Sequence, residues 1–271
     1  MNIRITDSEF NRLIGFMHKT YGIDLSKKRV LIEGRLSNML AEKGFKSYDE
    51  YMDSVFADKS GRETVELVNK LTTNHTYFMR EPQHFEYLKN VILPQIERNC
   101  HSRDVRIWCA ASSSGEEPYT IAMTIDDYFG SRRIGWDLRI LATDISNNVL
   151  QKARNATYSA EAIDPLPRDW KTKYFKRNAD GTYTVVDRIR KEVIFKEFNL
   201  MDKIVYKKPF DVIFCRNVMI YFDAPTKDAL IERFYDASNE GAYLLIGHAE
   251  TVSKKSRYSF VKPAIYQKKT R

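Results

Sequence analysis

The segment RIWCAASSSGEEPYTIAM, Arg106–Met123, begins with β-forming residues, passes through a run of small residues and ends in a helical pattern. Strand, tight turn and helix in this order usually hold a nucleotide in an α/β protein. A pyrophosphate needs free backbone amides, but here only Gly115 lacks a Cβ, and Glu116 and Glu117 open the helix, where carboxylates repel phosphate. The turn favours a ligand with positive charge and no diphosphate, although the two glutamates would serve equally well as caps of the helix dipole.

β-rich segments alternate with helical segments after residue 105. The β-rich segments are VRIWCAA, DLRILATDI, EVIFKEFNL, FDVIFCRNV and AYLLIGHAE, with a last pair around YSFVKPAIYQKK. This alternation predicts a doubly wound, mostly parallel α/β sheet with helices on both faces. Asp180–Gly181 lies between β-formers and predicts a small antiparallel β insertion over about residues 172–192.

The first part of the chain has a helical pattern throughout. Capping boxes at Thr6–Glu9 and Ser47–Glu50 each precede apolar residues at helical spacing, and Ser26 is expected to cap the helix between them. We therefore predict an all-α N-terminal domain over residues 1–72, a linker and connecting helix over 73–98, and the α/β domain over 99–271.

The composition favours an anionic partner but does not identify which kind. The net charge is +8 and the isoelectric point is about 9.2, which suits nucleic acid, a membrane surface or an acidic protein. The three cysteines have no metal-ligand spacing and predict reduced thiols in the cytoplasm. The N-terminus MNIRITDSEF is polar, and no apolar run approaches the roughly 20 residues of a membrane span, so neither a leader nor a transmembrane segment is expected.

Polar residues end four of the predicted strands. Ligands of doubly wound sheets bind outside the carboxyl ends of the strands, and these positions are Ala110–Gly115, Asp144, Asn199 and Arg216–Asn217. An acidic residue such as Asp144 can hold the ribose hydroxyls of an adenosine, although alone it is equally well explained as a helix N-cap. Adenosine, positive charge and the absence of phosphate together indicate S-adenosylmethionine.

The strings SSSGEEPYT, ATDIS, FCRNVMIYFD and TNHTYFMRE resemble the CheR family, the chemotaxis receptor methyltransferases, and the resemblance covers nearly the whole chain. It implies a class I methyltransferase-like sheet, S-adenosylmethionine as methyl donor and S-adenosylhomocysteine as product. The expected substrates are glutamate side chains on the cytoplasmic helices of methyl-accepting chemoreceptors, which become methyl esters during adaptation. It also implies a cytoplasmic monomer that works at the membrane-bound receptor array.

The resemblance further implies individual site residues. Arg80 and Tyr221 would stand nearest the transferred methyl group, although Tyr221 in an apolar run is equally well explained by core packing. No metal is expected, and an ionised glutamate substrate needs no general base. The residues expected to bind the cofactor are Asn74, Thr76, Arg80, Ala111, Glu117, Asp144, Asn199, Leu200, Arg216 and Asn217.

Lys27, Lys28, Arg29 and Arg35 are expected to form a basic face that docks the glutamate-rich receptor helix, the alternative being an ordinary solvated face. The insertion loop NADGT lacks the glycine-rich character of relatives that grip a C-terminal receptor pentapeptide, so use of such a tether stays open. Three rival classes remain: a nucleic-acid methyltransferase, disfavoured by RNVMIY after the fourth strand, a non-catalytic binding module, and a nicotinamide dehydrogenase, disfavoured by the missing phosphate loop.

Overall fold

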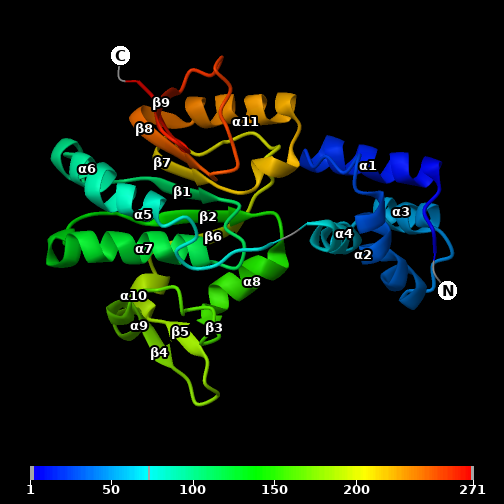
Figure 1. Ribbon diagram of the computed structural model, residues 1–271, viewed down its shortest axis with the longest axis horizontal. Coiled ribbons are helices and arrows are strands. Elements are labelled where there is room, and N and C mark those ends of the chain that lie inside the picture. Colours follow the sequence, from blue (N-terminus) through cyan, green and yellow to red (C-terminus); the bar gives the residue numbers. More distant parts are fainter. Residues whose placement is uncertain (1–2, 73, 270–271) are drawn as a thin grey trace. The chain divides into compact units, whose positions relative to one another are not determined.

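The computed structural model describes residues 3–72 and 74–269 (Figure 1). The chain divides into two compact units. The helical unit contains the residues up to Thr73 together with Tyr221–Lys227, and the sheet unit contains Asn74–Ile220 and Asp228–Arg271.

The described part of the helical unit is built from α1 (Asp7–Tyr21), α2 (Arg29–Glu42), α3 (Tyr48–Ala57) and α4 (Arg62–Leu71). Thr6 begins α1 with the predicted capping box, since its side chain accepts the N–H of Glu9 (3.3 Å) and the Glu9 carboxylate accepts the N–H of Thr6 (2.8 Å). Leu13, Met17 and Leu36 are completely buried, so the apolar faces of these helices form a core of their own.

The start of α2 differs from the prediction. Ser26 does not cap the helix; its N–H donates to Asp24 (3.0 Å), and the N-cap is Lys28, which makes no side-chain capping bond. Lys27 and Lys28 therefore lie in the turn that precedes α2. Both residues precede the first residue of α2, so they are not part of the side of the helix.

The sheet unit contains a seven-stranded sheet in the order β6-β2-β1-β7-β8-β10-β9. Neighbouring strands from β6 to β8 are parallel, and β10 and β9 complete the sheet with antiparallel pairing. The strands are β1 (Ile107–Ala110), β2 (Ile140–Asp144), β6 (Val193–Glu197), β7 (Phe210–Cys215), β8 (Ser238–Ile246), β9 (Ser259–Lys262) and β10 (Ile265–Gln267). The chain runs outward from β1 to β6 and returns with β7 on the other side of β1, so the order reverses between β1 and β7, and the predicted doubly wound sheet is confirmed.

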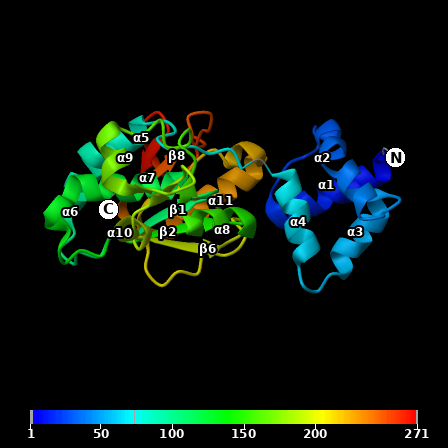
Figure 2. The same ribbon diagram turned by 90° about the horizontal axis from the view of Figure 1, so that it is seen from below.

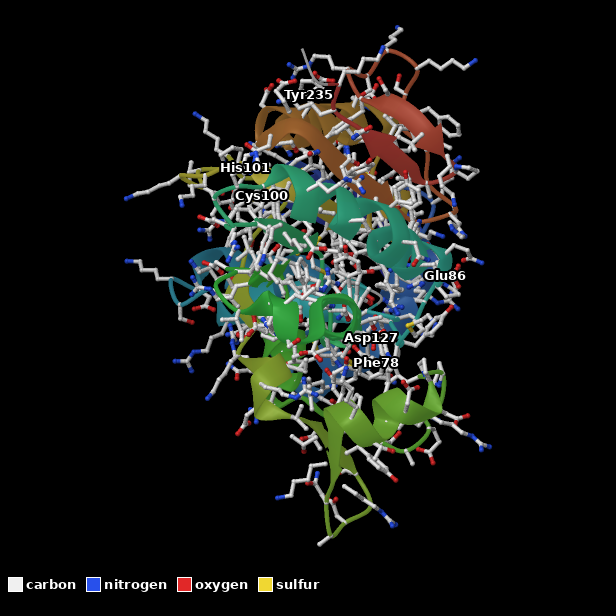
Figure 3. All side chains as sticks on the ribbon, turned by 90° about the vertical axis from the view of Figure 1, so that its left-hand side faces the viewer. Phe78, Glu86, Cys100, His101, Asp127 and Tyr235 are labelled. Atoms are coloured by element: carbon white, nitrogen blue, oxygen red, sulfur yellow. The ribbon has the colours of Figure 1, made fainter. Side chains whose placement is uncertain are left out.

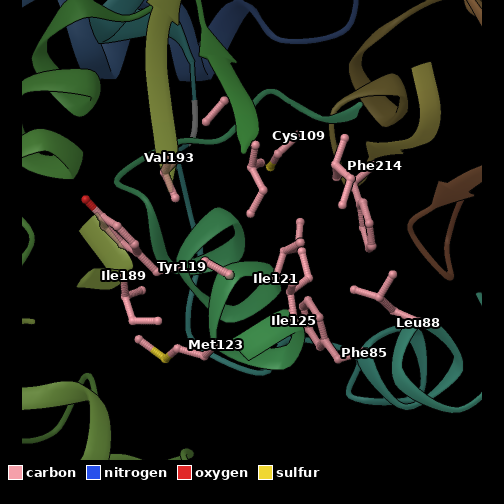
Figure 4. Packing of buried hydrophobic residues seen from close by; sticks show 14 of the residues in the cluster. Phe85, Leu88, Cys109, Tyr119, Ile121, Met123, Ile125, Ile189, Val193 and Phe214 are labelled. Atoms are coloured by element: carbon pink, nitrogen blue, oxygen red, sulfur yellow. The ribbon is translucent and has the colours of Figure 1, made fainter. Parts of the chain in front are cut away.

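Helices cover both faces of this sheet (Figure 1, Figure 2). Because side chains alternate along a strand, Cys109 of β1 joins the core beneath α7, which includes Ile121, while Trp108 packs on the opposite face against Phe234 of α11 (ring centroids 5.3 Å apart). Figure 4 shows Phe85 of the connecting helix in the first of these cores. The helices of this unit are α5 (Gln83–Tyr87), the π-helical turn η1 (Leu88–Ile92), α6 (Leu93–Asn99), α7 (Glu116–Phe129), η2 (Gly130–Arg133), α8 (Asn147–Asn155), η3 (Met219–Tyr221) and α11 (Ala224–Asp236), the last two reaching into Tyr221–Lys227.

The insertion between β2 and β6 forms a second, antiparallel sheet in the order β3-β5-β4. Its elements are β3 (Thr157–Tyr158), α9 (Arg168–Tyr174), β4 (Phe175–Arg177), β5 (Tyr183–Val185) and α10 (Asp187–Arg190). Gly181 has φ +84°, and Asp180 accepts the N–H of Thr182 (3.0 Å), which closes the predicted hairpin. The short strand β3 was not predicted.

Of the described helices, none combines the length and the apolar character that a bilayer crossing requires.

Candidate active site

The loop between β1 and α7 has an unusual backbone. Ala111 (φ +64°), Ser113 (φ +48°) and Gly115 (φ +100°) all occupy left-handed conformations. A Cβ on Gly115 would lie 2.9 Å from the hydroxyl of Tyr158 and 3.1 Å from the Cα of Ala153, so glycine is required both for its φ and for close approach to α8. The loop is therefore tightly fitted between neighbouring elements.

Three amides of this loop form hydrogen bonds within the protein. The N–H of Ser112 donates to the carbonyl of Thr143 (2.8 Å), that of Ser113 donates to Asp144 Oδ2 (2.8 Å), and that of Gly115 donates to the carbonyl of Ser112 (3.2 Å). Phosphate binding at a helix N-terminus depends on such amides pointing at the ligand. These three amides are already bonded, so they are not free to bind a diphosphate.

Asp144 lies at the end of β2 and is buried. Its second oxygen, Oδ1, accepts the N–H of Ser146 (2.9 Å), and burial raises the pKa of the carboxyl. The alternative role as N-cap is wrong, since Ser146 caps α8 by accepting the N–H of Val149 (3.4 Å). The carbonyl of Asp144 accepts the N–H of Phe198 (3.0 Å), which places the predicted residue Asn199 beside the same strand end.

Arg216, at the end of β7, lies completely buried between two carboxylates. Its guanidinium forms an ion pair with Glu117 of α7, donates to Glu81 Oε2 (3.1 Å) and donates to the main-chain carbonyl of Arg80. One cation thus faces two anions, so the group carries a surplus negative charge. Glu117 was predicted to attract a cation. Because Arg216 already neutralises part of the local charge, this attraction is weaker than the prediction assumed.

The linker passes along the β1–α7 loop. The carbonyl of Asn74 accepts the hydroxyl of Ser113 (3.0 Å), and the Arg80 side chain donates to the carbonyl of His75 (2.8 Å) with its guanidinium 5.7 Å from the ring of Tyr77. The linker thus contacts the loop through Asn74, and it contacts Arg216 through the main-chain carbonyl of Arg80.

The sequence argument missed two site residues, Glu81 and Glu250, both of which bond to the predicted residue Asn217. Asn217 has φ +57°, its N–H donates to Glu250 Oε2 (2.9 Å), and its side-chain amide donates to Glu81 Oε1 (3.2 Å). Glu250 follows β8, so applying the strand-end rule to the fifth strand would have found it. Glu81 stands one residue after Arg80 and carried no separate signal.

The remaining predicted residues belong to the turn after β6, the linker and the helical unit. Asn199 and Leu200 form the turn after β6, and the carbonyl of Leu200 accepts a bond from Arg233 (2.6 Å). Thr76 is half-buried on the linker. Tyr221 groups by its contacts with the helical unit, so its relation to Arg80 stays a prediction.

The predicted docking residues fall into two kinds. Lys27 and Lys28 are exposed. Arg29 places its guanidinium 4.5 Å from the ring of Phe10, and Arg35 donates to carbonyls at the end of α4, the nearer at 3.0 Å, so both arginines hold the helical unit together. A shallow groove here is lined by Phe10, Ser26, Lys27, Lys28, Arg29, Val30 and Leu31.

The strand ends of the sheet fit a cationic nucleoside. The hydroxyl of Ser112 is buried and has no hydrogen-bond partner among the described residues, so it can bond to a ligand that reaches the loop. An acidic residue at the end of β2, three first-loop amides that are already bonded and a surplus of carboxylates beside Arg216 fit the class of S-adenosylmethionine-dependent methyltransferases.

Comparisons with known proteins narrow the class to a family. Residues 8–72 match the family model of the all-alpha domain of CheR methyltransferase, and residues 74–266 match that of its SAM-binding domain. The chain therefore belongs to the CheR methyltransferase family and is a methyltransferase that uses S-adenosylmethionine.

Curated relatives agree along the whole length of the chain. The chemotaxis protein methyltransferase of Borreliella burgdorferi is 44% identical over 273 residues, which cover 99% of this chain and 96% of the relative. Chemotaxis protein methyltransferase 2 of Vibrio cholerae is 36% identical, with coverages of 96% and 91%. The chemotaxis protein methyltransferase of Escherichia coli is 34% identical, with coverages of 94% and 88%.

Proposed function

We propose that this chain transfers the methyl group of S-adenosylmethionine to glutamate side chains on the cytoplasmic helices of methyl-accepting chemoreceptors. The products are glutamyl methyl esters and S-adenosylhomocysteine, and the role is chemotactic adaptation in the cytoplasm. The names of the curated relatives support the substrate class. The observation that carries the proposal is the strand-end site, in which three first-loop amides are already bonded and two carboxylates face the buried guanidinium of Arg216.

The cofactor would be held by residues from the linker and the ends of four strands. Asp144 already accepts two amides, and each of its oxygens retains a second lone pair for a ribose hydroxyl. Glu117 and Glu81 provide the negative potential that suits a sulfonium and an ammonium group. When bound, S-adenosylmethionine supplies an electrophilic methyl group. The proposed contacts are Asn74, Thr76, Arg80, Ala111, Glu117, Asp144, Asn199, Leu200, Arg216 and Asn217.

Transfer to a carboxylate requires orientation and little acid–base chemistry. A glutamate with pKa near 4.3 is ionised at neutral pH and is already the nucleophile. Arg80 uses Nη1 to bond the carbonyl of His75, which leaves other N–H donors of its planar fork to orient the incoming carboxylate. Tyr221 is proposed as the second residue beside the methyl group. Alignment of reacting groups contributes about 7–11 kcal/mol in well-oriented systems.

The helical unit would recognise the receptor. Lys27 and Lys28 are exposed at the groove, and Val30 beside them is 83% exposed, so the groove offers positive charge next to an apolar contact. A glutamate-rich helix complements this combination and would be steered to it electrostatically. The contacts of Arg29 and Arg35 within the helical unit support an indirect role for them, in which they hold the docking surface in shape.

Labelled methyl donor and receptor-bearing membranes test the proposal. We expect label on the receptor that alkali releases as methanol, because methyl esters hydrolyse in base whereas methylated amines do not. Arg80→Ala should remove most of the transfer and leave a folded protein, while Arg98→Ala, at an exposed position of α6, should transfer normally. Label that is stable to alkali would exclude a glutamyl ester, and normal turnover by Arg80→Ala would exclude the proposed role of that residue.

A further inference from the structure

We propose that Glu81 is a positioning residue that fixes Arg216 and Asn217 at the strand-end site, and that its negative charge sets the affinity for the methyl donor. The inference rests on the proposed function, because it takes Arg216 and Asn217 to be cofactor-binding residues. Glu81 belongs to none of the sets of residues predicted from the sequence.

Glu81 joins three segments that are distant in the sequence. Its Oε2 accepts Nη2 of Arg216 (3.1 Å), and its Oε1 accepts both the side-chain amide of Asn217 (3.2 Å) and the N–H of His248 (3.2 Å). The linker is thereby fastened to the ends of β7 and β8 by one carboxylate. Its side chain is only 15% exposed, so these bonds are largely shielded from water.

The backbone at Glu81 is held in an uncommon conformation. Its φ is +55°, in the left-handed region that a glutamate seldom adopts, and Met79 two residues earlier has φ +58°. Such conformations persist only where the surrounding contacts determine them, and they concentrate at functional sites. The bonds of the Glu81 carboxylate are contacts of this kind, since they direct the side chain toward the strand ends.

Arg216 depends on the charge of Glu81. The buried guanidinium is balanced by Glu117 on one side and by Glu81 on the other. Removing one negative charge would leave the guanidinium to move toward the remaining carboxylate, because a buried charge without its partner is strongly unfavourable. Asn217 would lose its side-chain acceptor in the same change, so both proposed cofactor contacts would be displaced together.

Glu250 supports the same positions through the main chain. It is buried, and its Oε2 accepts the N–H groups of Asn217 (2.9 Å) and Gly247 (2.7 Å). A Cβ on Gly247 would lie 2.5 Å from the side-chain amide of Asn217, so glycine at this position leaves the space in which this amide donates to Glu81. The two carboxylates therefore bond to different parts of Asn217: Glu250 accepts its main-chain N–H and Glu81 accepts its side-chain amide.

A metal site is the competing explanation for this cluster. Donor atoms of Glu81, His84 and His248 lie within 4.8 Å of one another, and both ring nitrogens of His84 are buried without a hydrogen-bond partner. Both oxygens of Glu81, however, already accept N–H groups, and the Arg216 guanidinium 3.1 Å away would repel a cation. The arrangement fits a carboxylate that positions neighbouring donors better than one that coordinates a metal.

Calorimetric binding of S-adenosylhomocysteine to the full chain provides the test. Glu81→Gln keeps the size of the side chain and removes its charge, so we expect the Kd to rise about tenfold to a hundredfold, as loss of a charge-assisted contact implies. The KM for receptor should be unchanged. Glu86→Gln, at an exposed position of the following helix (Figure 3), should bind like wild type. Glu81→Asp retains the charge and should bind more tightly than Glu81→Gln.

Either of two results would overturn the inference: a Kd for Glu81→Gln within twofold of wild type, or a Kd for Glu81→Asp no lower than that for Glu81→Gln. If Glu81→Gln does not fold, Glu81→Asp decides: because it retains the charge, the thermal shift that saturating S-adenosylhomocysteine gives it should stay close to that of wild type, and loss of this shift overturns the inference. Failure of the wild-type chain to bind donor or product would instead contradict the proposed function, so the two failures are distinguishable.

Discussion

Buried carboxylates organise the strand-end site residue by residue. Asp144 accepts the amides of Ser113 and Ser146, and Glu250 accepts those of Asn217 and Gly247. Burial raises the pKa of both carboxyls, and the amide donors partly offset that effect. Because the loops are fastened by the protein itself, little ordering remains to be done when a ligand binds, which favours affinity.

His84 makes the stability of the fold depend on pH. Its side chain is 1% exposed; burial lowers its pKa to about 3, and the charge of Arg216 adds to this effect while Glu81 opposes it. The folded-state pKa lies below the unfolded value near 6.5, so the neutral ring contributes stability that is complete above pH 6.5 and is lost as the pH falls toward 3. Between pH 7 and pH 5 we expect the free energy of unfolding to fall by about 2 kcal/mol through this residue.

Denaturant unfolding at pH 7 and pH 5 measures this loss. His84→Gln should lose less stability between the two pH values than wild type does, by about 2 kcal/mol. The matched control is His101→Gln, at an exposed position (Figure 3), which should keep the wild-type pH dependence. Equal pH dependence in wild type and His84→Gln would show that the His84 ring is not held neutral by the fold.

At the scale of elements, the turn between β1 and α7 is tightly constrained. Gly115 combines φ +100° with contacts that leave no room for a Cβ, whereas Gly181, in the hairpin of the insertion, has φ +84° and nothing within 4 Å of the added Cβ position. Gly115→Ala should therefore destabilise the protein by roughly 2–4 kcal/mol, from backbone strain plus overlap with Tyr158 and Ala153. Gly181→Ala should show the strain alone, of roughly 1 kcal/mol.

Thermal or denaturant unfolding of the two alanine variants separates these effects. The larger loss in Gly115→Ala should be accompanied by weaker binding of S-adenosylhomocysteine, because the overlap displaces the loop that carries Ser112 and Ser113. The same small loss in both variants would mean that the turn yields easily, and the close approach to α8 would then have no energetic consequence.

Most elements were predictable because their patterns are local. The core strands are short runs of β-forming residues bounded by polar residues, and capping residues such as Thr6 and Ser47 act within three positions of themselves. β3 has only two residues and no pattern of its own; it forms because Tyr158 and its neighbour pair with β5. The same limit applies to Ser26, which has the chemistry of a cap but bonds to Asp24.

The candidate site was predictable to the extent that it follows from sheet topology. Asp144, Arg216 and Asn217 end strands that meet at one edge, so their neighbourhood follows from the strand order. Glu81 serves by contacting residues that are 135 and 136 positions away, and no spacing in the sequence encodes such a pairing. Residues that position other residues are therefore harder to predict than those that end strands.

The molecule as a whole has a net charge of +8, and its cationic side chains are of two kinds: some are bonded within the protein and others are exposed. Arg216, Arg29 and Arg35 are committed to contacts within their own units. Lys27 and Lys28 are exposed beside a groove with an apolar contact, which supports the docking role proposed for them.

Charge reversal at the groove tests this assignment. Lys27→Glu combined with Lys28→Glu should raise the KM for receptor about tenfold, because a steering attraction becomes a repulsion, while the Kd for S-adenosylhomocysteine stays unchanged. The increase should shrink at high ionic strength, since exposed charges are screened. The measurement is the initial rate of methyl transfer at varied receptor concentration, in low and high salt.

Lys254→Glu combined with Lys255→Glu provides the matched control, since these two lysines are exposed in the sheet unit and their reversal alters the net charge by the same amount. If docking depends on the groove, this pair should leave the KM for receptor near the wild-type value. An equal rise in KM for both pairs would mean that the receptor responds to net charge alone, and an unchanged KM for the groove pair would show that receptor helices bind elsewhere. Only an increase confined to Lys27 and Lys28 assigns docking to the turn before α2, because long-range attraction depends on total charge whereas a docked complex depends on where that charge lies.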